Sequence, residues 1–448
     1  MRSIREKHIM EFDISYTDKE ITPWGGMVFL KQMLQKIGFK EVITSNPDLP
    51  QSGSNRGYKT TTIIEAFITS IWCGANRFLH TEVTRHDSAL GKIFNWSTIP
   101  GQDTYKRFFG KFDQATNQKV SDYFYSWIFD NFKFDNFTLD IDSSVMTRYG
   151  EQEGAKKGYN PAKKGRSSHH PLIAFIDDVK LVANMWLRSG DTSSSNNFLS
   201  FLEDTLSKLK NKTVSLIRLD SGFFQSNILD YLELKTMDYI IAVKFTHPIQ
   251  RVIHASNNWI VLDKGIEICE QIYQSDSWEK PRRIVIVRQR IKDRPQAPGK
   301  QLRLFSDEEI YKSYRYSAYV TNMKLAPSEI WRLYRGRANA ENRIKELKYD
   351  FGFDSFNLKD FFATEAALTF AMLAYNLMAL FRTFVLQEKT QRSLSTLRYR
   401  TFAIGAYFEK VNDKLVLKIA LNKKRREWYS GLWNYSKVFK YPFEISNA

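Results

Sequence analysis

Cysteine, glycine and proline are all scarce in this sequence of 448 residues, and each shortage excludes a class of protein. The two cysteines, Cys73 and Cys269, lie far apart and form no CxxC pair or Cys/His cluster, which excludes a disulfide framework and a zinc site. The 21 glycines and 12 prolines are too few for a collagen-like or low-complexity chain. Hydrophobic residues make up 43% of the sequence, so most of the chain is expected to fold, in a reducing compartment.

Long hydrophobic runs are missing as well. The most apolar segment, Ala366 to Phe381, spans 16 residues between Glu365 and Arg382. A membrane span needs about 20 such residues, so this segment is predicted to be a buried helix. Charged residues interrupt every apolar stretch among the first 15 residues, which leaves no secretory signal. The sequence therefore predicts a cytoplasmic protein without a membrane partner.

Acidic residues are the last shortage. Lys and Arg number 66 against 49 Asp and Glu, so the chain carries a net charge of +17, which indicates a polyanionic partner. Nucleic acid is favoured over an anionic membrane. Residues 382–448 hold 14 basic and five acidic side chains, including the run Lys423, Lys424, Arg425 and Arg426. This segment is either a solvated basic face or a surface that binds phosphates.

The first part of the chain reads as helical. Apolar residues recur at helical spacing over Met27 to Ile37, Thr62 to Trp72 and Val120 to Phe132. We therefore expect a helical N-terminal DNA-binding region over residues 1–125, in which the segment with Lys106, Arg107 and Lys111 is a candidate recognition helix.

From Phe137 the apolar residues alternate with polar ones, which predicts a half-buried strand that carries Asp140 and Asp142. A hairpin is expected next, over Leu172 to Leu187, with Asp177 and Asp178 in its turn. A helix and a further strand follow, and that strand ends at Asp220. Between the first strand and the hairpin lies a loop with five basic residues and no acidic one, a candidate DNA-binding segment; its basic residues are Lys156, Lys157, Lys163, Lys164 and Arg166.

This order of elements is that of a ribonuclease H-like α/β sheet, in which the first and fourth strands are neighbours. Carboxylates at the ends of those strands can converge on two divalent cations that stabilise the attacking and leaving oxygens of a phosphodiester. Because the ligands are hard oxygens, Mg²⁺ is the expected cofactor, two ions per site, with Mn²⁺ as a substitute.

A helix expected after Pro327 supplies a third carboxylate. Tyr334, Arg337, Glu341 and Lys348 lie at offsets 0, 3, 7 and 14, which at 100° per residue places them within an arc of about 60°. An exposed helix with ion pairs is the plain alternative. That alternative does not explain a carboxylate flanked by two cations that can hold phosphates.

These four residues match at full spacing the Y-x2-R-x3-E-x6-K signature, and the sequence therefore resembles the DDE-type insertion-sequence transposases. LDIDSS at 139–144 is similar to the first-aspartate strand of that family, and IRLDSGFF at 217–224 to its second; the resemblance covers about 137–385. It implies that Asp142, Asp220 and Glu341 are the catalytic metal ligands. It also implies that Tyr334, Arg337 and Lys348 contact the DNA backbone near them.

Asp140 shares a strand face with Asp142, and either residue can be the first ligand. Asp142 is preferred because it directly precedes the small hydroxylic pair Ser143 and Ser144, as in the family. The resemblance further implies a mainly β insertion between the second aspartate and the glutamate. An aromatic residue there, Trp259 or Trp278, is a candidate for holding a flipped base, although a buried Trp is more often part of a core.

The expected organisation is a ribonuclease H-like mixed-sheet core with a β insertion, flanked by helical N- and C-terminal regions. The core occupies 126–232 and 323–390, the insertion 233–322, and the basic C-terminal region 391–448. The predicted function is cut-and-paste DNA transposition by a homodimer bound to terminal inverted repeats and target DNA. The alternatives are a transposase-derived DNA-binding regulator without catalysis and a structure-specific nuclease on the same core.

Overall fold

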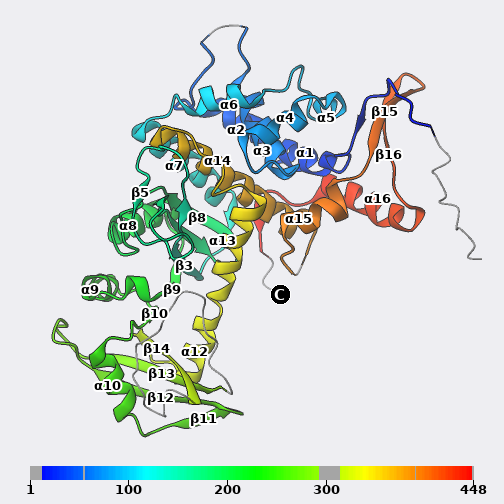
Figure 1. Ribbon diagram of the computed structural model, residues 1–448. Helices are drawn as coiled ribbons and strands as arrows, with labels where there is room; N and C mark the ends of the chain where they lie inside the picture. Colours follow the sequence, from blue (N-terminus) through cyan, green and yellow to red (C-terminus); the bar gives the residue numbers. More distant parts are fainter. Residues whose placement is uncertain (1–12, 54–55, 292–312, 389, 446–448) are drawn as a thin grey trace, which may run out of the picture.

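The computed structural model describes residues 13–53, 56–291, 313–388 and 390–445. Its centre is a mixed sheet of nine strands in the order β11-β12-β13-β14-β10-β9-β3-β7-β8 (Figure 1). The strands are β3 Phe137–Ser143, β7 Leu172–Ile176, β8 Leu181–Trp186, β9 Val214–Leu219, β10 Tyr239–Ala242, β11 Ile260–Asp263, β12 Ile266–Tyr273, β13 Arg282–Arg290 and β14 Tyr314–Thr321. β3, β9 and β10 are parallel, and every other neighbouring pair is antiparallel.

The strands of the sheet's centre form because their apolar residues are covered on both faces. β7 reads LIAFI and is buried at every position, and β3 is buried from Leu139 to Asp142. β3 was expected to be half buried. Its polar face is instead covered by α12 (Pro327–Arg335) and α13 (Ala338–Asp350), since Arg337 of the joint between these helices ion-pairs with Asp142.

The insertion extends the same sheet. A mainly β insertion was expected, and its strands join the core sheet: β14 pairs antiparallel with β10, and β10 pairs in parallel with β9, so the hydrogen bonding is continuous from β8 to β11. The expected bounds of the insertion, 233–322, include β10, which pairs directly with β9 of the core. In Figure 1 the strands β11 to β14 lie at the end of the molecule opposite the N-terminal helices.

The N-terminal region is helical, as predicted. Its helices are α1 Met27–Lys36, α2 Phe39–Ser45, α3 Thr60–Trp72, η1 Phe78–His80, α4 Thr81–Arg85, α5 Ser88–Phe94, α6 Gln102–Phe109 and α7 Gln114–Asp130. Gly38 ends α1 with φ +66°, a left-handed conformation that glycine adopts without strain, and the chain then turns directly into α2.

Helix α14 (Phe361–Leu380) joins this region to the sheet. It packs against α3 and β8, and the Trp72 indole of α3 donates a hydrogen bond to the carbonyl of Ala374 at 3.0 Å. Together with its π-helical continuation η3 (Phe381–Val385), α14 is long and apolar enough to cross a membrane, but 83% of its most apolar window is buried inside the protein. The prediction of a buried helix is confirmed.

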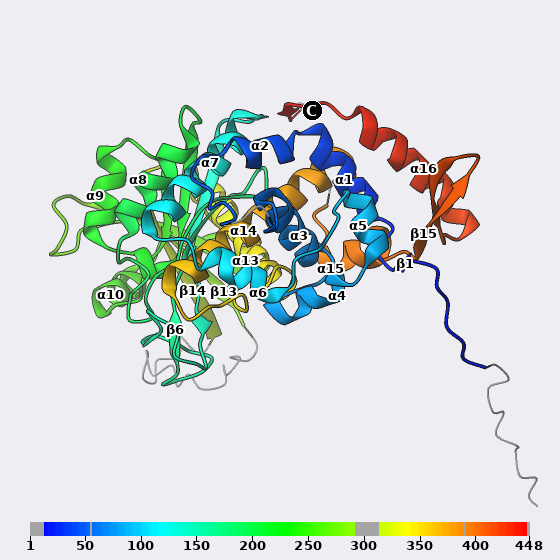
Figure 2. The ribbon, with the colours of Figure 1, turned by 90° about the horizontal axis from the view of Figure 1, so that it is seen from above.

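The C-terminal region was expected to be helical, and it contains a β-hairpin in addition to its helices. β15 (Ala406–Val411) and β16 (Lys414–Ile419) form it, and β15 also pairs with β1 (Ile21–Thr22) near the other end of the chain. Helix α16 (Lys423–Val438) then packs on α1, with the rings of Phe29 and Tyr429 4.7 Å apart. Figure 2 shows the hairpin and α16 along one side of the N-terminal helices.

The remaining elements complete the connections. They are β2 Phe132–Lys133, β4 Met146–Thr147, β5 Lys156–Lys157, β6 Ser167–His169, α8 Phe198–Leu209, η2 Ser221–Phe223, α9 Ser226–Leu234, α10 His247–Ala255, α15 Leu394–Leu397, η4 Arg398–Phe402 and β17 Phe443–Glu444.

Candidate active site

Two of the three predicted carboxylates stand side by side at the carboxyl ends of neighbouring parallel strands. Asp142 is the penultimate residue of β3, and Asp220 directly follows β9. The strands pair Ile141 with Leu219, so the next residue of each strand, Asp142 and Asp220, lies at the same level. Asp142 is buried, with 8% of its surface exposed. The geometry that the sequence predicted for this pair is present.

The third carboxylate, Glu341, comes from the first turn of α13. Its side chain is 59% exposed, and the guanidinium of Arg337 lies 3.6 Å from it. The same guanidinium lies 2.9 Å from Oδ2 of Asp142. Arg337 therefore ion-pairs with both carboxylates and brings the helix joint against the end of β3.

The electrostatics of Asp142 show that the carboxylates act on one another. Burial raises the pKa of Asp142 to about 6, and the negative charges of Asp220 and Glu341 push it in the same direction. Arg337 and a hydrogen bond from the backbone N–H of Ser143, at 2.8 Å, oppose this rise. The pKa stays high although Arg337 is present, so the site still favours additional positive charge.

The donor set fits divalent cations. Asp142, Asp220 and Glu341 offer hard carboxylate oxygens from two strand ends and one helix, which is what Mg²⁺ or Mn²⁺ prefers. In the described part of the chain no three acidic, His or Cys side chains are close enough to hold a metal in the present arrangement. In place of a cation, the guanidinium of Arg337 compensates the negative charges of Asp142 and Glu341.

The other two residues of the predicted stripe also face the sheet. The hydroxyl of Tyr334 donates to the carbonyl of Leu219 at 3.3 Å, and Nζ of Lys348 donates to the carbonyl of Val145 at 3.0 Å. The stripe was expected on one regular helix. The helix is instead interrupted at Gly336 and Arg337, where each backbone N–H bonds to the carbonyl three residues earlier.

Asp140, the alternative first ligand, has another partner. It is fully buried, and both of its carboxylate oxygens accept from Arg218, at 2.7 and 2.8 Å. Arg218 is its register partner on β9. Sequence reasoning missed Arg218, although a single charged residue inside the strand VSLIRL is a readable signal. The structure therefore favours Asp142 as the carboxylate available to a metal.

Asp177 has more than the turn role that the sequence predicted. Asp178 lies in the turn and accepts from the backbone N–H of Thr138, in the neighbouring strand β3, at 2.8 Å. Asp177 instead ion-pairs with Arg218 at 2.8 Å and with Arg343 of α13 at 2.5 Å. Burial raises the pKa of Asp177, but these two guanidiniums outweigh it and hold that pKa below its ordinary value.

The basic loop forms a small three-stranded sheet, β4-β6-β5, that begins three residues after Ser143. All five predicted basic residues are exposed, and Lys156 is paired with Asp191 at 3.1 Å. His169 and His170 at its base are buried. Burial lowers the pKa of His169 to about 4, and its Nε2 bonds to the carbonyl of Glu153 at 2.9 Å, so its role there is structural.

The two tryptophans considered for base flipping both have partners within the protein. Trp278 is buried and contacts Phe224 and Arg282. The ring of Trp259 lies 4.1 Å from the guanidinium of Arg288.

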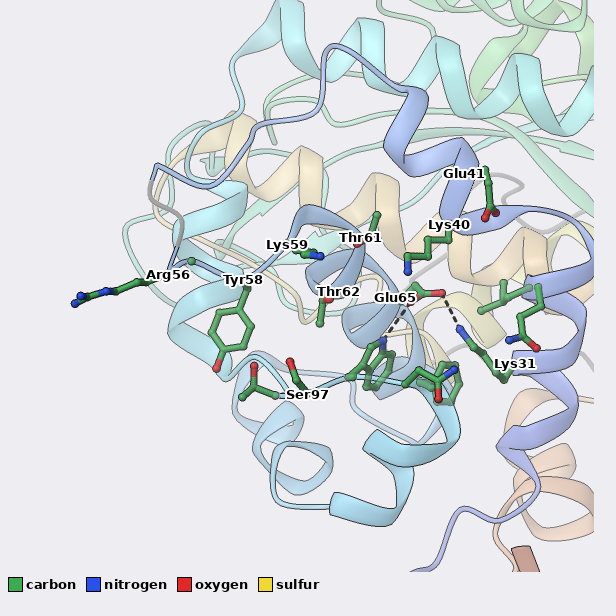
Figure 3. A pocket seen from close by; sticks show the side chains of 17 residues that line it. Lys31, Lys40, Glu41, Arg56, Tyr58, Lys59, Thr61, Thr62, Glu65 and Ser97 are labelled. Carbon is green, nitrogen blue, oxygen red and sulfur yellow. Dashed lines mark hydrogen bonds and ion pairs between the residues drawn. The ribbon is translucent and has the colours of Figure 1, made fainter. Parts of the chain in front are cut away.

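A separate hollow of about 590 Å³ lies among α1, α2 and α3, and none of the three carboxylates lines it (Figure 3). Its lining residues include the exposed cations Lys40, Arg56 and Lys59. At its floor the buried Glu65 accepts from the indole N–H of Trp96 at 3.2 Å and lies 3.5 Å from Nζ of Lys31.

Comparisons with known proteins place the chain in a family. No curated protein sequence matches it. Among solved structures, a cryo-EM structure of the piggyBac transposase synaptic complex with hairpin DNA aligns with 92% of this chain and 85% of that chain, at 12% identity and a TM-score of 0.47. The family described as "Transposase DDE domain group 1" matches residues 6–434. The match spans nearly the whole sequence, and the chain therefore belongs to this family of DDE transposases.

Proposed function

We propose that the protein is a cut-and-paste transposase of an insertion sequence, which cleaves the element ends and joins them to target DNA. The observation that carries this proposal is that Asp142 and Asp220 end neighbouring parallel strands at the same level, while Arg337 ion-pairs with both Asp142 and Glu341. A DNA-binding regulator without catalysis has no need for such an arrangement.

The sheet supports a ribonuclease H-like core. The order β8-β7-β3-β9-β10, with β3, β9 and β10 parallel and β7 antiparallel to β3 and β8, is the strand order of that fold. β11 to β14 extend it beyond the fifth strand.

Asp142, Asp220 and Glu341 would hold two Mg²⁺ ions, or Mn²⁺ in their place. Bound there, the ions would activate a water molecule and neutralise the charge that develops on the attacking and leaving oxygens. Cleavage of a phosphodiester by water leaves a 3′-hydroxyl at the element end. That hydroxyl then attacks a phosphodiester of the target, a new P–O bond forms, and a target 3′-oxygen leaves.

Residues around the carboxylates have separate roles in this proposal. Arg337 balances the charge of Asp142 and Glu341, and it is placed to meet the phosphate of a bound strand once cations replace it. Tyr334 and Lys348 hold the helix to the carbonyls that flank the site, Leu219 and Val145, and are proposed to contact the DNA backbone beside it.

DNA is the proposed partner because the net positive charge of the chain is large and the basic residues of the loop are exposed. The basic loop displays five exposed cations between 14 and 24 residues along the chain from Asp142. Two element ends must be cut and joined together, so we propose a homodimer on paired terminal inverted repeats. The scarcity of cysteine and the basic charge are consistent with a place in the cytoplasm beside the DNA.

The experiment compares Asp142→Asn, Asp220→Asn and Glu341→Gln with the unchanged protein. The assay is Mg²⁺-dependent nicking and strand transfer on a duplex that carries an element end. Each substitution keeps size and hydrogen bonding while it removes a charge, so each is expected to abolish both reactions. A gel shift on the same DNA should show binding retained.

Two outcomes would replace the proposal. Nicking without strand transfer by the unchanged protein indicates the nuclease, and binding without any nicking indicates the regulator. Normal nicking by Glu341→Gln would contradict the three-carboxylate mechanism.

A further inference from the structure

We propose that Arg218 is a positioning residue, which fixes Glu341 relative to Asp142 and Asp220 by holding the joint between α12 and α13 against the sheet. This inference rests on the proposed function, because it concerns the same carboxylates.

The contacts of Arg218 with the neighbouring strand β3 hold its guanidinium rigidly. Its Nε and Nη2 bind the two oxygens of Asp140, in a two-pronged pair that is almost completely buried. The residues face each other on the neighbouring strands β9 and β3. The plane of the guanidinium is therefore fixed before it meets the helix.

The end of α12 and the joint after it pack against this guanidinium. Nη1 of Arg218 donates to the carbonyl of Leu333, in the last turn of α12, at 2.6 Å. Gly336, at the joint, lies so close that a Cβ placed on it would collide with the same Nη1. Its φ of −57° suits any residue, so space alone requires glycine here. Because hydrogen bonds hold all three nitrogens of Arg218, the guanidinium cannot simply swing away.

A second contact lies beyond Glu341. Nη2 of Arg218 also reaches Asp177 at 2.8 Å, and Asp177 accepts from Arg343 through its side chain at 2.5 Å and its carbonyl at 2.9 Å. Arg343 lies two residues after Glu341, and Gly336 five residues before it. The two contacts thus bracket Glu341 and tie its helix to β9, β3 and the turn after β7.

Glu341 depends on these contacts because it has little packing of its own. Its side chain is 59% exposed, and Arg337 at 3.6 Å is its ion-pair partner. Stability alone explains the network poorly, since buried ion pairs contribute little more than apolar residues of similar size. A network that fixes a carboxylate to within a fraction of an ångström has a direct use in a metal site.

The main test is Gly336→Ala. Alanine favours a helix over glycine, so a joint without a positioning role would tolerate or benefit from it. Positioning predicts instead that the joint shifts. Cleavage should fall about 10- to 100-fold and the half-saturating Mg²⁺ concentration should rise, while the gel shift and the thermal unfolding midpoint are retained. Gly431→Ala is the matched control, because Gly431 lies in α16 with open space around it.

Mn²⁺ binding gives a readout independent of cleavage. The EPR signal of free Mn²⁺, measured without DNA, should show a Kd about tenfold higher in Gly336→Ala than in the unchanged protein and in Gly431→Ala. An equal Kd in all three would overturn the positioning role. Weaker Mn²⁺ binding by Gly336→Ala, in a protein that never cleaves DNA, would sustain positioning and refute the proposed function.

Arg218→Lys tests the guanidinium itself. Lysine keeps a positive charge opposite Asp140 but cannot make the paired hydrogen bonds of the guanidinium, so cleavage and Mn²⁺ affinity should both fall. Adding Gly336→Ala to Arg218→Lys should cost little more, since the colliding Nη1 is gone; additive losses would count against the inference. If Gly336→Ala does not fold, Arg218→Lys decides alone, and full activity with normal Mn²⁺ affinity would refute the proposal.

Discussion

Replacing Asp142 by asparagine is expected to stabilise the metal-free protein at neutral pH, although it abolishes cleavage. Burial and the neighbouring carboxylates raise the pKa of Asp142 from 3.8 to about 6 in the folded protein. The folded state therefore holds this proton more tightly than the unfolded chain. Keeping the carboxylate ionised at pH 7 thus costs the folded state about 3 kcal/mol, from about 1.4 kcal/mol per pKa unit. Asparagine resembles the protonated carboxyl and avoids most of that cost.

The pH dependence follows from the same values. As pH rises from about 4 through about 6, the unchanged protein loses stability through Asp142, and above about pH 7 the loss is complete. The advantage of Asp142→Asn should therefore be largest at pH 7.5 and nearly absent at pH 4. Added Mg²⁺ should raise the stability of the unchanged protein and leave the variant unaffected.

Thermal unfolding in EDTA, at pH 7.5 and pH 4, measures this difference. Asp413→Asn makes the same chemical change on a side chain that is 92% exposed, and it should leave the midpoint close to that of the unchanged protein. A lower midpoint for Asp142→Asn at pH 7.5, or an advantage that grows towards pH 4, would refute the reasoning about the site.

Three further predictions concern neighbouring features. Asp177→Asn should lower the free energy of unfolding by about 1.5 to 3 kcal/mol, because the guanidiniums of Arg218 and Arg343 hold the pKa of Asp177 below its ordinary value and the folded protein therefore favours the ionised carboxylate; a chemical denaturation curve like that of the unchanged protein would contradict this. Neutralising three exposed cations of α16 should reduce the slope of log K for DNA binding against log salt concentration by up to about 2.7; the substitutions are Lys423→Gln, Lys424→Gln and Arg426→Gln. Stability should be retained, because cations are unfavourable in the first turn of a helix. An unchanged slope would show that α16 does not contact the DNA. Sedimentation should show a dimer when two element ends are present, and complete strand transfer by a monomer on single ends would argue against paired assembly.

The sequence predicted that Asp142 and Asp220 lie beside each other at the ends of two strands, because strand alternation and strand ends are local properties. It predicted the stripe on α12 and α13 for the same reason. Alternation says which residues share a face and nothing about what covers that face. The cover on β3 comes from Arg337, about 200 residues later in the chain, so the partner of Asp142 could not be predicted. The partner of Asp140 was marked by the single charged residue of VSLIRL, Arg218, and was overlooked.

The misjudged elements have similar causes. The break at Gly336 escaped notice because a fixed turn of 100° per residue assumes a regular helix. β15 was missed because it pairs with β1, almost 400 residues earlier, and neither strand is marked by its own sequence. The pairing of β14 with β10 decides that the insertion extends the sheet, and pairing partners leave no local pattern.

The pairing of the two chain ends has a consequence for the time course of synthesis. Ile21 and Thr22 can pair only after the strand with Ala406 and Tyr407 has been synthesised, and Phe29 can pack only after Tyr429 has been synthesised. At about 5 to 20 residues per second, a ribosome needs on the order of 20 to 80 s to deliver these partners. During that interval one side of α1 lacks its cover. A chain that stops before β15 never acquires it, so such truncated products are expected to aggregate or to be degraded.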